Sequence, residues 1–347
     1  MEEKIIYEVI KYKDDLGRSV LELNIEGPSI NYIIINTIRR TILSDIPIYA
    51  FTNFNFTTNE SIFNNNVMKL RLNNMPVWGI PNKIDKFVKE NKSQTNNNVL
   101  EDENNDDFPL DDDIDLENET NVNISSLNQL TMYVDYKNTE NAIVSVTTNH
   151  AKFYYGNKNI DCPYHIPLVI IKLQPYQSIN FSAITVLGTE KENAIFSPVS
   201  VCYYNEISDN KFKFIIESKG QITEQRIIEV ALINIISSLE NLVKIIPLEQ
   251  NSHKGKIIIN GENNTMGNLL SYAMQIHKEV KFAGYNIPHL LENKVIIDYE
   301  LINEKIKLKD VFNEINDYLI NIFKILLKCN KKIDLKTNTI KKSHKNK

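Results

Sequence analysis

Two long stretches in the second half of the chain carry a stripe of large apolar side chains, and they limit the possible folds more than any other feature. Within residues 223–246 and 306–328 these side chains recur at steps of three and four residues, which places them on one face of a helix. Two such helices are expected to pack against each other, or against another long helix, at a shallow angle. The first stripe contains Ile228, Leu232, Ile235, Leu239, Leu242 and Ile246, and the second Leu308, Phe312, Ile315, Leu319, Ile322 and Leu326.

Local signals mark where the first of these helices begins and ends. Thr223 can cap the free amides of the first turn, and Ile222 and Ile227 are spaced as a hydrophobic staple across that start. Pro247 cannot continue a helix, so we expect the helix to end just before it.

A hairpin and a short helix come before the first long helix. Residues 4–13 and 19–26 have the apolar pattern of two paired strands. A helical pattern follows, which Ser29 or Asn31 can cap and which is expected to end near Pro47.

The second long helix is preceded by similar elements. A strand pattern begins near residue 255, Thr265 can cap a short helix, and a turn-rich link leads into a strand at 294–299. The second half of the chain therefore repeats the order of elements of the first half. It lacks only the long insertion that separates the short helix from the long helix in the first half.

The residues between the short helix and the long helix of the first half contain several strand patterns. In 178–185, apolar and polar side chains alternate with the strand period of two. Residues 89–128 differ, because they are polar and low in complexity, and 101–119 contain eleven acids and no Lys or Arg. Such blocks usually stay solvated. We expect a disordered acidic loop that acts as a spacer, although a basic partner could bind it. From Lys324 to the end, nine lysines accompany one Asp.

Composition places the chain among soluble, intracellular proteins. Its 42% hydrophobic and 24% charged residues are typical of a globular protein. No apolar run approaches the roughly 20 residues that cross a bilayer, and the first residues do not resemble a secretory signal. Cys162, Cys202 and Cys329 are far apart, so neither a disulfide framework nor a CxxC metal site is indicated.

Several separated motifs in the second half resemble a known family. These are Thr265–Leu270, Phe282–Tyr285, Pro288-His289 and Lys294–Ile297, in this order over a short span. They resemble the small alpha-like subunit of cellular RNA polymerases, the archaeal L type or the eleventh-largest eukaryotic subunit.

The first half resembles the large alpha-like subunit, the archaeal D type or third-largest eukaryotic subunit. The segments that carry this resemblance are Asn36–Ala50, the signature helix of that family, and Lys191–Val199. The resemblance implies that Asn36, Arg39 and Arg40 dock the large polymerase subunits. From the pattern alone, the two arginines are equally consistent with solvated charges on a helix surface.

Residues 71–76 resemble a turn of the same family in which Asn73 stands for a glycine and Leu70 for the preceding histidine. Asn tolerates the left-handed conformation, so we expect the turn to be kept. Some large alpha-like subunits carry a cysteine cluster for zinc or iron–sulfur. This chain has no cysteine before Cys162, which excludes that cluster.

Together the two resemblances imply an α+β fold with two alpha-like dimerisation domains that form an intramolecular pseudo-dimer, the first interrupted by a mostly β inserted domain. The predicted parts are 1–50 plus 200–246 (large domain), 51–199 (inserted domain with the loop 89–128), 247–254 (linker), 255–328 (small domain) and 329–347 (basic flexible tail). The implied pairing interface contains Asn268, Leu269, Leu270, Phe282, Gly284, Tyr285, Pro288 and His289.

The resemblance implies a non-catalytic assembly subunit of a DNA-directed RNA polymerase, on which two large catalytic subunits assemble. The implied partners are the largest and second-largest polymerase subunits and small zinc-binding subunits, with DNA met only through the complex and no membrane. No catalytic residue, metal site or cofactor motif stands out. Such fusions occur in large DNA viruses, which implies the virion and host cytoplasm; a cellular protein would act in the nucleus or cytoplasm.

Two other classes of function remain open at this point. A standalone nucleic-acid-binding protein could use the Lys-rich tail on phosphates, with strong salt dependence. An enzyme with an unrecognised site is the other alternative. Copurification separates the three, because only a polymerase subunit travels with two very large chains.

Overall fold

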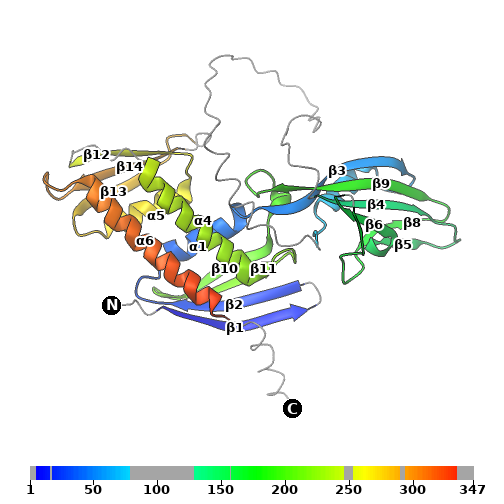
Figure 1. Cartoon of the computed structure of the whole chain (residues 1–347), viewed down its shortest axis with the longest axis horizontal. Coiled ribbons are helices and arrows are strands. Elements are labelled where there is room, and N and C mark those ends of the chain that lie inside the picture. Colours follow the sequence, from blue (N-terminus) through cyan, green and yellow to red (C-terminus); the bar gives the residue numbers. More distant parts are fainter. Residues whose placement is uncertain are drawn as a thin grey trace, which may run out of the picture. The chain divides into compact units, whose positions relative to one another are not determined.

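The computed structural model describes residues 5–15, 18–78, 129–156, 158–245, 253–289 and 294–333 (Figure 1). The predicted acidic loop at 89–128, most of the predicted linker and residues 334–347 lie outside these ranges. The chain divides into two compact units. The first consists of Met1–Ala50, Pro76–Trp78 and Leu187–Lys347, and the second of Phe51–Met75 and Gly79–Val186.

The first unit contains a four-stranded antiparallel sheet with the order β1-β2-β11-β10. Alternation along β2 places Leu21, Leu23 and Ile25 in the core, while Glu22 on the other face pairs with Lys213 at 2.8 Å. The strands are β1 (Ile6–Asp15), β2 (Arg18–Glu26), β10 (Val199–Ser208) and β11 (Lys211–Ser218), and together with α1 (Tyr32–Ser44) and α4 (Glu224–Ile245) we call them the large half.

The same unit contains a second sheet, three-stranded and antiparallel, with the order β12-β14-β13. The central strand alternates strictly, with Val295, Ile297, Tyr299 and Leu301 buried. The elements are β12 (Lys254–Asn260), α5 (Asn264–Gln275), β13 (Val280–Asn286), β14 (Lys294–Leu301) and α6 (Leu308–Lys331), which we call the small half.

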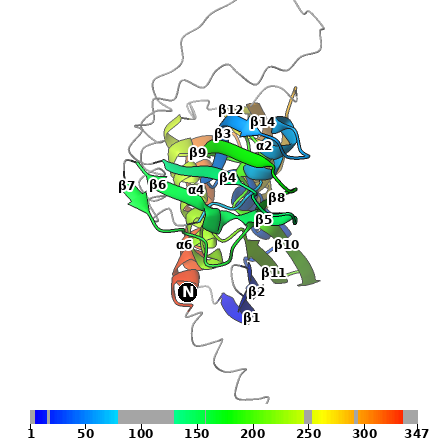
Figure 2. The ribbon, with the colours of Figure 1, turned by 90° about the vertical axis from the view of Figure 1, so that its right-hand side faces the viewer.

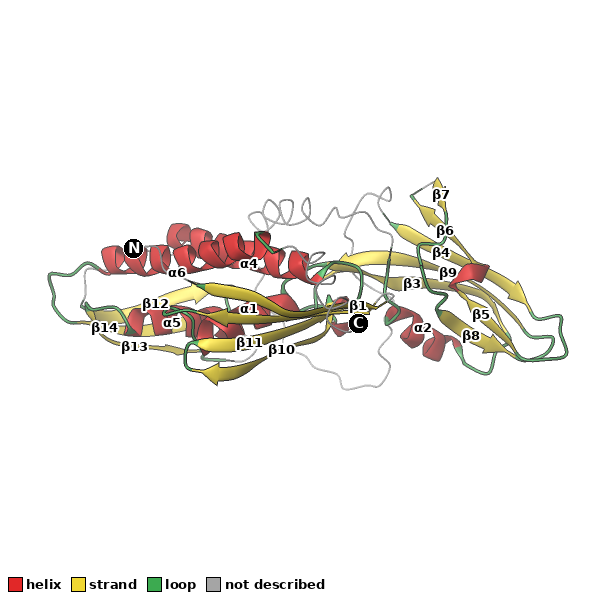
Figure 3. Ribbon diagram, turned by 90° about the horizontal axis from the view of Figure 1, so that it is seen from below, coloured by secondary structure: helices red, strands yellow, loops and turns green. Residues whose placement is uncertain are grey.

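The two long helices α4 and α6 lie side by side, and Figure 3 shows them on one side of both sheets. They run antiparallel, because Gln225 near the start of α4 donates hydrogen bonds to the carbonyls of Asn330 and Ile333 at the end of α6. Every stripe residue that the structure describes is buried. At about 1.5–3 kcal/mol for each large apolar side chain, this seam is a major source of stability. The predicted packing of the two helices is confirmed.

The short helices α1 and α5 also contact each other across the two halves. Asn31 caps α1, because its side-chain oxygen accepts hydrogen bonds from the amides of Ile33 and Ile34 at 2.9 and 3.0 Å. Its Nδ2 donates to the Tyr272 hydroxyl of α5 at 3.1 Å. With the α4–α6 seam, this contact makes the two halves an intramolecular pseudo-dimer, as predicted.

The second unit is rich in strands, as expected for the residues between α1 and the large half's last strands (Figure 2). A five-stranded sheet has the order β3-β9-β4-β6-β7, and β5 pairs with β8. Phe153 and Phe181 are fully buried in this unit. The elements are β3 (Ile48–Asn59), α2 (Asn65–Asn73), β4 (Leu130–Lys137), β5 (Val144–Thr147), β6 (Ala151–Tyr155), β7 (Lys158–Ile160), β8 (Val169–Leu173) and β9 (Ser178–Gly188).

Two local predictions are wrong. The helix α5 is capped by Asn263, whose side chain accepts from the Thr265 amide at 2.9 Å, so Thr265 lies inside the first turn. Asn73 is the last residue of α2 and is not left-handed; among the described non-glycine residues only Tyr176 has a positive φ. The cause is Asn64, which caps α2 and starts a helix that continues through this segment.

The described helices include none that is both long and apolar enough to cross a membrane.

Candidate docking face and junction

The outward face of α1 presents the residues predicted to dock other subunits. Its inner face is apolar and buried, whereas Asn36 and Arg39 are half-buried and Arg40 is exposed. The Nε of Arg39 donates to the Asn36 side-chain oxygen at 3.0 Å, a contact between neighbours three residues apart on the helix. Within the described residues, neither guanidinium forms an ion pair.

Arg39 also lies close to β10, which α1 crosses. Burial raises the pKa of the Cys202 thiol on that strand to about 12, and the positive charge of Arg39 acts in the opposite direction. A thiol with such a pKa stays protonated and unreactive at neutral pH. Asn36 therefore orients the Arg39 side chain, and the guanidinium lies near enough to β10 for its charge to act on Cys202.

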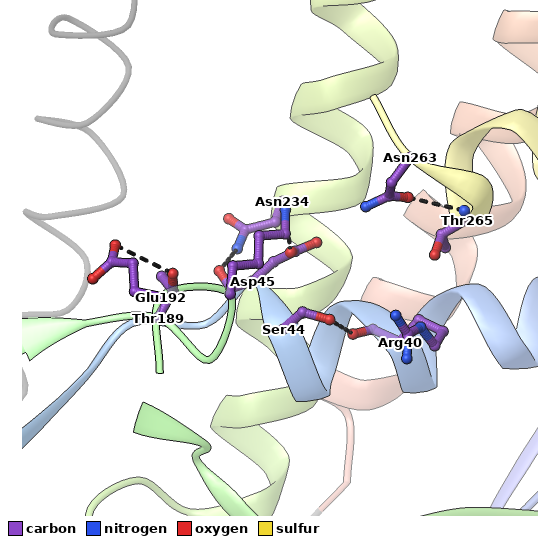
Figure 4. Close-up of polar contacts among 9 residues, drawn as sticks. Arg40, Ser44, Asp45, Thr189, Glu192, Asn234, Asn263 and Thr265 are labelled. Atoms are coloured by element: carbon purple, nitrogen blue, oxygen red, sulfur yellow. Dashed lines mark hydrogen bonds and ion pairs between the residues drawn. The ribbon is translucent and has the colours of Figure 1, made fainter. Parts of the chain in front are cut away.

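A polar junction forms where α1 ends (Figure 4). The Asp45 carboxylate pairs with Lys191 Nζ at 2.7 Å, and the Asp45 carbonyl accepts from Asn234 Nδ2 of α4 at 3.1 Å. Lys191 belongs to the segment 191–199 and Asp45 to the α1 segment, the two motifs on which the large-subunit resemblance rests.

The connection between β12 and α5 brings a third charge to this junction. Burial raises the pKa of Glu262 to about 6; the Lys191 ammonium acts against this rise and the Asp45 carboxylate adds to it. Glu262 directly precedes the α5 cap Asn263, so the junction links the large half to the start of the small half's short helix. Sequence reasoning missed it, because no local pattern relates the three positions.

The residues predicted to form the pairing interface fall into two groups. Leu269 and Leu270 are buried on α5, which contacts both α1 and α6, and Asn268 on the same helix is half-buried. Pro288 and His289 follow β13 and are exposed.

The other three predicted pairing residues lie on β13. Tyr285 packs inside the small half, where a Cβ added to Gly267 of α5 would meet its ring at 2.8 Å. Phe282 is 56% exposed, and its ring lies over Gly284, where an added Cβ would come within 3.2 Å of it. These residues therefore shape the small half itself.

Two contacts that hold the halves together were not predicted. Tyr272 receives the Asn31 hydrogen bond, and Asn330 lies fully buried between Gln225 and the Tyr7 hydroxyl of β1. Burial raises the pKa of Tyr7, so this hydroxyl stays a donor. The sequence pattern does not predict these contacts, because a buried polar residue on a helix has the same pattern as an exposed one.

Among the described residues there is no group of three or more His, Cys, Asp or Glu side chains that could hold a metal ion.

The fold and these contacts define a pseudo-dimer whose two halves belong to one chain. Comparison with protein families identifies it. The chain belongs to the RNA polymerase Rpb3/Rpb11 dimerisation domain family, with one family model matching residues 29–239 and a second matching residues 254–328. It is therefore an alpha-like subunit of an RNA polymerase.

Individual relatives agree with this assignment. A protein of Acanthamoeba polyphaga mimivirus, described as the DNA-directed RNA polymerase subunit R470, is 25% identical over 344 residues, which cover 88% of this chain and 89% of the viral protein. Two proteins of Caenorhabditis briggsae match short segments. One, described as the RNA polymerase I and III subunit RPAC2, is 38% identical over 48 residues, 14% of this chain and 33% of its own length. The other, described as the RNA polymerase II subunit RPB11, is 42% identical over 45 residues, 13% of this chain and 37% of its own length.

Proposed function

We propose that this chain is the assembly platform of a multisubunit DNA-directed RNA polymerase, and that it brings together the largest and second-largest subunits, which carry out catalysis. The chain itself has a structural role and no cofactor. The observation that carries the proposal is the pairing of two dimerisation halves inside one polypeptide, through α4 with α6 and α1 with α5.

A covalent connection changes how such a platform forms. Two separate subunits must meet at their cellular concentrations, whereas two halves of one chain meet at the effective concentration that the connecting residues set. The α4–α6 seam can therefore form as soon as the chain is complete. Assembly of the polymerase then begins from a finished platform, without a prior dimerisation step.

The outward face of α1 supplies the docking groups in this proposal. The guanidinium groups of Arg39 and Arg40 present planar forks that suit carboxylates or carbonyls of another chain. Asn36 orients the first of them through its 3.0 Å hydrogen bond. Adjacent residues on a helix point about 100° apart, so the two arginines reach different parts of the partner surface.

Replacing both arginines by alanine should weaken capture of the second-largest subunit without unfolding the chain. Truncating one member of a buried interfacial charge pair costs about 2–5 kcal/mol, which corresponds to a loss of tens- to thousands-fold in affinity. The measurement is a quantitative pull-down, after circular dichroism has shown that the variant is folded.

The matched control for this pull-down replaces two exposed lysines of the same unit, Lys305 and Lys309, by alanine. It should capture the partner at wild-type levels. A folded Arg39/Arg40 variant that does the same would remove the docking role and leave the arginines as solvated surface charges.

The small zinc-binding polymerase subunits are the remaining partners in this proposal, and DNA is met only through the complex. Location follows the polymerase: the virion and host cytoplasm for a viral enzyme, the nucleus or cytoplasm for a cellular one. The mimivirus relative favours the viral setting.

A further inference from the structure

The second unit exposes a group of apolar side chains around α2. This helix buries only Met68 and Leu72, and the loop before it is equally open. Exposed fractions reach 69% for Ile62 and 64% for Leu70. Contiguous apolar surface that a soluble protein leaves open often marks a site of interaction. We call this group, Ile62, Phe63, Val67 and Leu70, the α2 patch.

Hydrogen bonds hold the loop of the α2 patch in a fixed shape. The side-chain Nδ2 of Asn59 donates to the Phe63 carbonyl at 2.9 Å and to the Asn65 side-chain oxygen at 2.7 Å. Its oxygen accepts from the backbone and hydroxyl of Ser61. Asn64 caps α2 by accepting from the Val67 amide at 2.9 Å. The apolar side chains are thus displayed on a preorganised backbone, which lowers the entropy cost of binding.

A cation fixes the aromatic member of the patch. The Arg71 guanidinium carbon lies 5.4 Å from the centre of the Phe63 ring, within the range of a cation–π contact. The same guanidinium donates to the Ile170 carbonyl of β8 at 3.4 Å. Arg71 therefore holds Phe63 in place and puts a positive charge at the edge of the patch.

Beside these side chains the surface is hollowed. The hollow has a volume of about 530 Å³ and is lined by Asn59 and residues 61–66. It combines the apolar side chains of Ile62 and Phe63 with several side-chain amides. The hollow is shallow and open, so a bulky apolar side chain that lies in it would contact Ile62 and Phe63 without being enclosed.

In the segment of the chain that carries the patch, the bases outnumber the acids. Between Phe51 and Met75 the bases are Lys69 and Arg71, and the single acid is Glu60. The Glu60 carboxylate accepts from the Ser178 amide and hydroxyl at 2.8 and 2.7 Å, so it is already engaged. At about 100° per residue on α2, Val67 and Leu70 lie between the two cations.

This chemistry narrows the possible occupants. Two cations neutralise too few phosphates for a nucleic acid, and the one aromatic ring already has a cation over it. A second copy of the patch would bring like charges together, which disfavours self-association. A peptide segment that has both carboxylates and a bulky apolar side chain complements this surface. Its apolar side chain can lie in the hollow, and its carboxylates can face the two cations.

We propose that the α2 patch docks an acidic segment of another polymerase chain, with a bulky apolar side chain of that segment in the hollow and its carboxylates facing Lys69 and Arg71. The inference rests on the family assignment and is independent of the docking role of Arg39 and Arg40. The patch is a second attachment point, contained entirely within the second unit.

Photo-cross-linking within the purified polymerase tests this proposal. A benzophenone amino acid replaces Ile62, and the linked peptide is sequenced by mass spectrometry. The expected product is one segment of another polymerase chain that contains several Asp or Glu residues and a bulky apolar residue. The matched control places the same group at Ile143, which is 63% exposed on the same unit, and should give at least fivefold less product.

Charge reversal tests whether the cross-linking yield depends on salt, which binding through non-specific apolar contact alone would not show. Lys69→Glu should lower the cross-linking yield at Ile62 severalfold at low salt, and the effect should shrink as salt screens the charges. Leu70→Ser should lower it at all salt concentrations, because that position is exposed and its change removes only apolar contact. Both variants should retain the two large subunits, whereas the Arg39/Arg40 variant should lose one.

Any of four results would overturn the proposal: a product joined to nucleic acid, to a second copy, or to residues 101–119 of the same chain, or a yield at Ile62 that equals the Ile143 control. A yield that Lys69→Glu leaves unchanged would contradict the acidic character of the segment.

Discussion

At the scale of single residues, the junction beside α1 brings together charges from three distant parts of the chain. Asp45 and Lys191 form an ion pair at 2.7 Å, and Glu262 lies close enough for both to influence its pKa. The carboxylate of Glu262 is partly buried, and its charged form is therefore poorly solvated. Lys191 compensates only in part, because the net effect still raises the pKa to about 6.

This raised pKa makes stability depend on pH. The folded protein binds the Glu262 proton more tightly than the unfolded chain does, so the free energy of unfolding should fall as pH rises from about 4.5 to about 6. Glu262→Gln should match the wild type below that window and exceed its stability above it, by at most about 2 kcal/mol. Urea unfolding across the window measures this difference.

The control is Glu304→Gln, an exposed residue of the same unit, which should leave the pH profile unchanged. If Glu262→Gln is instead less stable than the wild type at neutral pH, the carboxylate stabilises the junction through Lys191, and the assigned balance of burial and charge is wrong.

At the scale of elements, the α4–α6 seam carries the pairing of the two halves. Leu239 lies in the middle of this seam with no exposed surface, and its neighbour Glu240 points outward and pairs loosely with Lys324 at 3.7 Å. The two positions are neighbours on α4, but Leu239 is packed in the seam, whereas Glu240 reaches Lys324 of α6 only through an exposed ion pair. They separate the contribution of the seam from that of the helix itself.

Leu239→Ala should lower the free energy of unfolding by about 2–5 kcal/mol, because it opens a cavity in packed core. Glu240→Ala should cost less than about 1 kcal/mol, since exposed ion pairs contribute little. Denaturant unfolding followed by circular dichroism compares the two. Equal losses would show that the seam does not hold the halves together.

The sequence predicts these elements well where the signal is local. The stripes of α4 and α6 and the alternation of the strands depend only on neighbouring residues. The predicted cap of α5 and the predicted turn at Asn73 are wrong because a nearby Asn caps each helix instead. Asn263 rather than Thr265 caps α5, and Asn64 starts the helix that contains Asn73. The Asn36–Arg39 contact follows from helical spacing.

The junction and the α2 patch were beyond prediction for a different reason. Lys191 and Asp45 meet only because the fold returns the chain from the second unit to the first. The apolar residues of the patch have an ordinary core-like pattern, and only the structure shows that Ile62 and Leu70 are exposed. Both features depend on which surfaces the remaining elements cover.

At the scale of the whole molecule, the chain contains both members of a pairing that the family names describe as dimerisation. The family model for residues 254–328 covers the small half, and the model for 29–239 covers most of the large half and the second unit. One copy should therefore occupy the place that two separate subunits would otherwise fill. The number of copies of this chain in the polymerase therefore depends on whether its two halves pair within one molecule.

Native mass spectrometry of the polymerase, purified through a tag on this chain, measures that number most directly. We expect one copy of this chain for each copy of the largest and of the second-largest subunit. Two copies of this chain per complex would mean that the halves pair between molecules, and a preparation without the two large subunits would contradict the role as an assembly platform.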